Sequence, residues 1–142
     1  MSIAELINPN VETLPRSATC VDAARLMRGQ NIGSVVVAND REPVGVLTDR
    51  DLAVRVMAEA RDPAKVRVED VMSPHPIFLS VRRSLDEAIA TMRDLGVRRL
   101  PVVNDGGRLA AVISLDDILA RIARQVGQLG EAIQREIQAP VP

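Results

Sequence analysis

The chain repeats itself at a spacing of about 65 residues, and this repeat restricts the fold more than any other feature of the sequence. Three segments of the first copy match three of the second: 21–27 with 86–92, 37–40 with 102–105, and 48–51 with 114–117. The last pair is offset by 66 residues because the second copy has one more residue in the preceding turn. Two copies of one unit therefore account for most of the 142 residues.

Each copy is predicted to fold in the order strand, helix, strand, turn, strand, helix. First strands are expected at 11–14 and 77–80, and first helices at about 19–29 and 84–95, where Thr19 and Ser84 can act as N-caps. Runs of β-branched residues around Asn-Asp turns predict two hairpins, which pair 34–38 with 44–47 and 100–103 with 109–113. A last helix begins near Asp49 in one copy and near Leu115 in the other.

A polar, proline-containing connection at 61–65 separates the two copies. The predicted domains are residues 1–62 for the first repeat, 63–121 for the second and 122–142 for a helical extension. The fold class is α/β (α+β), with both repeats packed as one pseudo-twofold module. We expect a shared core, because a unit of this size buries too little surface alone.

The composition argues against several classes of function. With 46% hydrophobic residues the chain can fill a core, and with one cysteine, Cys20, it is expected to be a cytoplasmic protein without disulfides. The net charge of −1 and the absence of Trp and Tyr give no support to nucleic-acid binding, and no apolar run is long enough to span a membrane. A single histidine, His75, and no glycine-rich phosphate loop indicate that the chain is not an enzyme.

Two matching motifs could bind a ligand. Thr48 is followed by Asp51, and Ser114 by Asp117, each at the junction of a strand and a helix. A carboxylate there can accept hydrogen bonds from ribose hydroxyls, and a helix N-terminus favours phosphate. The alternative is that Thr48 and Ser114 only cap their helices, with the aspartates as capping-box partners. The two roles are compatible.

The tandem β-α-β-β-α order resembles the CBS domain, the repeat named after cystathionine β-synthase, over about residues 1–121. The segments that carry the resemblance are Asp70-Val71-Met72-Ser73-Pro74, Gly45-Val46-Leu47-Thr48-Asp49-Arg50-Asp51 and Gly96-Val97-Arg98-Arg99-Leu100-Pro101-Val102-Val103. The resemblance implies a regulatory module, without a catalytic domain, whose clefts between the repeats bind adenosine nucleotides. It implies no required cofactor.

Transferred residue by residue, the resemblance implies two clefts. The principal cleft would be lined by Thr48, Arg50, Asp51, Pro76, Ile77, Val97, Arg98 and Arg99. The second would be lined by Val11, Ile32, Gly33, Ser114 and Asp117, with Glu12 and Asp116 beside them. Three guanidinium groups are thus expected to favour phosphate in the principal cleft, and the acidic second cleft to prefer an uncharged adenosine moiety. The alternative is that the arginines form a solvated surface paired with nearby acids.

The leading functional hypothesis is a sensor of AMP, ADP or ATP, with NAD and S-adenosylmethionine as less favoured ligands, that regulates a partner protein still to be identified. The alternative is a ligand-free scaffold for dimerisation or protein interaction. An apolar stripe continues beyond the repeats and consists of Ile118, Ile122, Val126, Leu129, Ile133 and Ile137. It could pack on its own module, on a second copy or on a foreign partner; we expect a homodimer.

Overall fold

The fold consists of two small sheets and their helices, seen here in a computed structural model that describes residues 1–7 and 9–140. The first repeat contains η1 (Ile3–Glu5), β1 (Thr13–Leu14), α1 (Cys20–Gln30), β2 (Ser34–Asn39), β3 (Glu42–Thr48), α2 (Asp49–Leu52) and η2 (Ala53–Met57). The second contains η3 (Val68–Asp70), β4 (Ser73–Pro74), β5 (Leu79–Ser80), α3 (Leu85–Leu95), β6 (Arg99–Val103), β7 (Leu109–Ser114) and α4 (Leu115–Gln138). The predicted mixed α+β class is confirmed.

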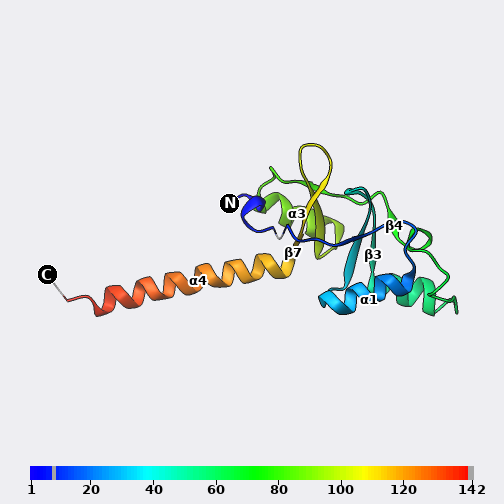
Figure 1. The fold of residues 1–142 in the computed structure, drawn as a ribbon. Coiled ribbons are helices and arrows are strands. Elements are labelled where there is room, and N and C mark those ends of the chain that lie inside the picture. The colour runs from blue at the N-terminus through cyan, green and yellow to red at the C-terminus, as the bar shows by residue number, and fades with distance from the viewer. Residues whose placement is uncertain (8, 141–142) are drawn as a thin grey trace.

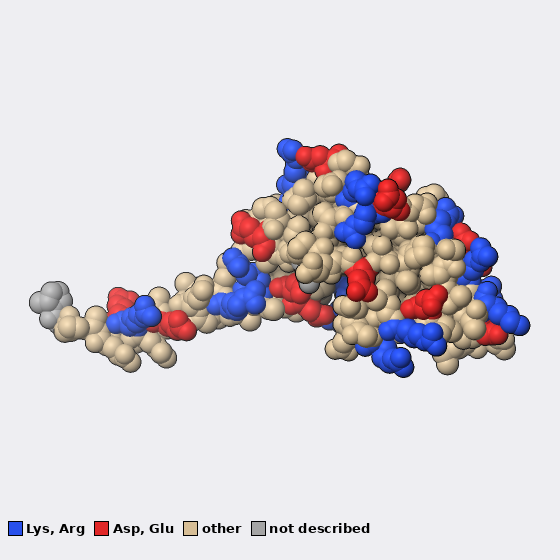
Figure 2. Space-filling view, in the orientation of Figure 1, with Lys and Arg blue, Asp and Glu red and all other residues tan. Residues whose placement is uncertain are grey.

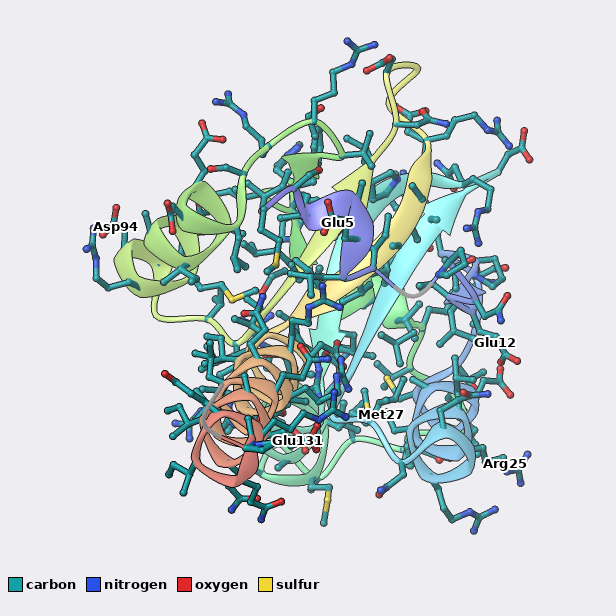
Figure 3. The ribbon with its side chains drawn as sticks, turned by 90° about the vertical axis from the view of Figure 1, so that its left-hand side faces the viewer. Glu5, Glu12, Arg25, Met27, Asp94 and Glu131 are labelled. Atoms are coloured by element: carbon teal, nitrogen blue, oxygen red, sulfur yellow. The ribbon has the colours of Figure 1, made fainter. Side chains whose placement is uncertain are left out.

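Both predicted hairpins are present and form the centre of their sheets. One sheet has the order β1-β2-β3-β4 and the other β5-β6-β7, and in each the first strand runs parallel to the second. The first strands are shorter than expected, because only two residues of each make a ladder. Figure 3, in which α4 points toward the viewer, shows α3 and α1 on opposite sides of the sheets.

The first helix of each repeat begins and ends as its sequence predicts. Thr19 forms a reciprocal capping box with Asp22, and Ser84 forms one with Glu87. The backbone hydrogen bonds from Thr19 and Ser84 hold the pKa of Asp22 and of Glu87 below their usual values. Each helix ends in the left-handed region, at Asn31 and Gly96, which are residue types suited to a positive φ.

The first short helix of each repeat, η1 or η3, packs into the core of the other repeat. This exchange was not predicted from the sequence. Ile3 lies in η1 at the start of the first repeat, yet it is fully buried in the core cluster of the second with Ala88 and Met92. Val68 stands 65 residues later and is fully buried in the core cluster of the first repeat. Figure 1 shows the N-terminal turn beside α3. The module therefore has two core clusters, and each of them contains residues from both repeats.

Two further contacts join the repeats. Strand β4, near the start of the second repeat, pairs antiparallel with β3 of the first, with Gly45 opposite Pro74. Arg41, at the first hairpin turn, donates hydrogen bonds to the carbonyl oxygens of Val11 and Leu109 at 2.9 and 3.0 Å. The repeats are thus held together by backbone pairing as well as by the exchanged segments.

Helix α4 extends away from the module (Figure 1), and in the space-filling view it forms a narrow projection (Figure 2). Its stripe does not pack back on its own module, because the apolar residues from Leu119 to Ile137 are exposed and Ile118 is the buried residue of the helix. Within residues 1–7 and 9–140, none of the helices is long and apolar enough to cross a membrane.

Candidate functional site

Three adjoining cavities lie between the repeats, where the hairpins of the two sheets face each other. A central cavity of about 650 Å³ is flanked by one of about 330 Å³ beside Asp51 and by one of about 350 Å³ beside Asp117. Arg99 lines all three. The three cavities therefore adjoin one another along the junction of the repeats.

Thr48 ends β3 and is the N-cap of α2, and Asp51 lies in the first turn of that helix. Their side chains form a reciprocal capping box, in which Asp51 Oδ2 accepts from the Thr48 amide at 2.9 Å and Thr48 Oγ1 accepts from the Asp51 amide at 3.0 Å. The other carboxylate oxygen lies 3.9 Å from Nε of Arg55, and the side chain is only 16% exposed. The capping role is therefore present, and it fixes the carboxylate at the rim of the cavity.

The cavity beside Asp51 gathers most of the residues predicted for the principal cleft. Its lining includes six of them: Thr48, Asp51, Pro76, Ile77, Val97 and Arg99. The first two come from the first repeat and the other four from the second, so the cavity exists only because the repeats pack together. His75 also lines it and has a positive φ of 53°.

Arg50 and Arg98, the other two residues predicted for the principal cleft, line the central cavity instead. Asp49 and Asp116 line the same cavity, and Arg98 pairs with Asp116 through an N–O distance of 2.9 Å. We expected the guanidinium groups in one cleft and the acidic residues in the other. This prediction was wrong, because arginines and aspartates line the same central cavity. The cause is side-chain reach, because Arg98 extends toward the start of α4.

The cavity beside Asp117 contains Val11, Ile32, Ser114 and Asp117 of the predicted second cleft, together with Glu12 and Asp116. Gly33 lies on the central cavity instead. Ser114 Oγ donates to Asp117 Oδ2 at 2.5 Å and accepts from the Asp117 amide at 3.1 Å. The Asp117 carboxylate thus accepts a hydrogen bond from a hydroxyl group, whereas the Asp51 carboxylate accepts one from a backbone amide.

In each repeat an equivalent backbone hydrogen bond joins the residue before the hairpin's first strand to the first residue of the helix that follows the hairpin. The Asp49 amide donates to the Gly33 carbonyl at 2.9 Å, and the Leu115 amide donates to the Arg98 carbonyl at 2.8 Å. A Cβ at Gly33 would lie 3.0 Å from Asp49 Oδ2, so the absence of a side chain there leaves room for the Asp49 carboxylate. The lining residues that the sequence did not predict include Asn10, Gln30, Ser34, Val46, Asp49, Leu95, Gly96, Pro101 and Val112.

Neither a reactive thiol nor a metal-binding cluster offers another candidate site among the residues that the structure describes. Cys20 is buried in the first core cluster, and burial raises the pKa of its thiol, which disfavours the reactive thiolate. The residues that the structure describes contain no group of three or more His, Cys, Asp or Glu side chains able to hold a metal ion. The cavities between the repeats are therefore the candidate site.

Comparison with known proteins points to one family. Residues 3–58 and 68–124 each match the model of the CBS domain. The uncharacterised protein MK0525 of Methanopyrus kandleri is 38% identical over 120 residues, which are 84% of this chain and 61% of MK0525. The CBS domain-containing protein YhcV of Bacillus subtilis is 33% identical over 117 residues, or 82% of each chain. This chain thus spans only about three fifths of the length of MK0525.

Solved structures agree with the sequence comparisons. The CBS domain protein PAE2072 from Pyrobaculum aerophilum, in complex with AMP, superposes with a TM-score of 0.77 at 26% identity and covers 87% of this chain and 99% of that one. The internal repeat, the two sheets and both family matches agree, and the chain belongs to the CBS-domain family.

Proposed function

We propose that this chain is a regulatory module that binds an adenine nucleotide between its repeats, with the adenosine beside Asp51 and the phosphate in the central cavity. The observation that carries the proposal is the composition of the cavity beside Asp51. It combines a fixed carboxylate and hydroxyl from the first repeat with apolar side chains from the second. The AMP complex of PAE2072 supports the ligand class.

The adenosine part of the ligand fits the chemistry of this cavity. Asp51 can accept hydrogen bonds from ribose hydroxyls, as acidic residues do in dinucleotide-binding folds. Ile77 and Val97 line the same cavity and are 53% and 38% exposed, so a purine placed between them would remove apolar surface from water. Such burial is worth roughly 25 cal/mol per Å², which supplies affinity without an aromatic stacking partner.

The phosphate part fits the central cavity, which shares Val46, Thr48, Val97 and Arg99 with the cavity beside Asp51. Arg50, Arg98 and Arg99 line it. The Arg98–Asp116 pair is 70% and 60% exposed at its two side chains. Exposed pairs of this kind contribute about 0–1 kcal/mol, so Arg98 can exchange Asp116 for a phosphate at small cost.

The cavity beside Asp117 is proposed as the weaker site for a charged ligand. Glu12, Asp116 and Asp117 surround it, and Arg99 is the cation that reaches it. Phosphate there would meet like charge, whereas adenosine would not.

The state of Cys20 bears on the compartment of the protein. An unpaired, buried cysteine fits a reducing compartment such as the cytoplasm.

The thermal unfolding midpoint tests the proposed function. A ligand that binds only the folded chain stabilises it by about 2.7 kcal/mol at a hundredfold excess over its Kd, which should raise the midpoint by about 10 °C with AMP. Adenosine should give a smaller shift, because it makes no phosphate contact. Guanosine monophosphate serves as the control for the base. If no adenine nucleotide changes the midpoint, the alternative function of a ligand-free interaction scaffold is favoured.

A further inference from the structure

The apolar face of α4 has no partner in the part of the chain that the structure describes. Its large side chains are between 41% and 77% exposed, and they are Leu119, Ile122, Val126, Leu129, Ile133 and Ile137. They follow one another along a helix that stands clear of the module (Figures 1 and 2). A continuous exposed apolar patch on the order of several hundred Å² is typical of an interaction surface.

The spacing of these residues is that of a coiled-coil seam. From Leu119 to Ile133 the steps alternate between three and four residues, so that Leu119, Val126 and Ile133 take position a of a heptad. Ile122 and Leu129 take position d. Two of the three a residues are β-branched and one d residue is leucine, a combination typical of two-stranded coiled coils. We call the residues at these five positions the α4 seam.

The charges on α4 do not oppose pairing with an identical helix. Positions e and g, beside the seam, are occupied by Ala123, Gln125, Gly130 and Ala132 over the central turns, so they carry no charge that would select a different helix. Arg121, Arg124, Glu131 and Arg135 lie at positions c and f, away from the seam. Ala123, Gly130 and Ala132 are also small, which lets two backbones approach closely.

We propose that the α4 seam binds the α4 seam of a second copy of this chain. Helix α4 has 24 residues, which correspond to about 36 Å, and about three heptads of it lie beyond Ile118. A membrane surface is a poorer match, because the polar face carries Glu131 as well as arginines and the helix has neither Trp nor Phe. The inference is independent of nucleotide binding.

The test compares two substitutions on adjacent residues of one turn. Leu129→Asp places a carboxylate in the α4 seam, whereas Gln128→Asp places the same charge outside the seam, at position c, and is the matched control. In light scattering at high micromolar concentration, the wild type and Gln128→Asp should have twice the chain mass of 15.4 kDa. Leu129→Asp should raise the dimer dissociation constant at least about 30-fold, the effect expected of a central interface residue.

Folding of the variants is checked by circular dichroism, and because Leu129 is 65% exposed and outside both core clusters, the module should remain folded. A monomeric wild type at this concentration would overturn the proposal, and so would a Leu129→Asp variant that dimerises as tightly as Gln128→Asp. Binding of the wild type to anionic vesicles, lost in Leu129→Asp and without dimerisation in solution, would assign the face to membranes instead.

Discussion

Replacing Ile3 by alanine should destabilise the whole module, although this residue lies near the N-terminus. Ile3 is fully buried in the core cluster of the second repeat, whose other buried residues lie between Leu79 and Ile118. Truncation of a buried Ile to Ala costs about 2–5 kcal/mol, because transfer energy is lost and a cavity remains. Against a total stability of about 5–15 kcal/mol, this is a large fraction. Urea denaturation followed by circular dichroism measures the loss.

The control for this prediction is Ile89→Ala, which makes the same truncation on the partly exposed face of α3 in the same repeat. It should cost less than about 1 kcal/mol. Since the repeats exchange Ile3 and Val68, we also expect one cooperative transition for the wild type and for both variants. Equal stability losses for the two variants, or separate transitions for the two repeats, would contradict the exchanged architecture.

Asp51→Ala should weaken AMP binding at least about tenfold. The substitution removes the carboxylate that is proposed to hold the ribose, and a hydrogen bond to a charged group is worth roughly 1.5–3 kcal/mol. It also removes the capping box with Thr48, so some stability is lost as well. Isothermal calorimetry with AMP measures the affinity, and thermal unfolding of the free protein measures the stability separately.

Two aspartates provide matched controls for Asp51→Ala. Asp22 occupies the same capping-box position in α1, away from the three cavities, so Asp22→Ala should cost stability but leave AMP affinity unchanged. Asp117→Ala alters the second cavity and should affect AMP less than Asp51→Ala does. If Asp117→Ala abolishes AMP binding while Asp51→Ala leaves it intact, the two cavities have been assigned the wrong way round.

The repeat made most of the fold predictable. Apolar spacing, N-cap residues and Asn-Asp turns are local signals, so both first helices and both hairpins were expected close to their observed bounds. The exchange of η1 and η3 was not predictable in this way. Ile3 and Val68 belong to short segments with weak local signals, and only long-range packing decides which core each of them enters.

The candidate site was predictable to the extent that it follows the backbone. Thr48 with Asp51 and Ser114 with Asp117 are fixed by strand-to-helix junctions, and the structure places each pair on its own cavity. The distribution of charge was not predictable, because a long guanidinium side chain can turn to either cavity. The position of Arg98 depends on its pairing with Asp116, a contact that repeat alignment cannot supply.

Equilibrium dialysis of the wild-type protein against AMP tests the central claim most directly. The chain has no Trp and no Tyr, so the near-ultraviolet absorbance of adenine can be read in the presence of the protein with little interference. Binding between the repeats predicts an excess of adenine absorbance on the protein side that saturates with increasing AMP and falls in Asp51→Ala. Equal absorbance on both sides at every AMP concentration would contradict a nucleotide-binding function for this module.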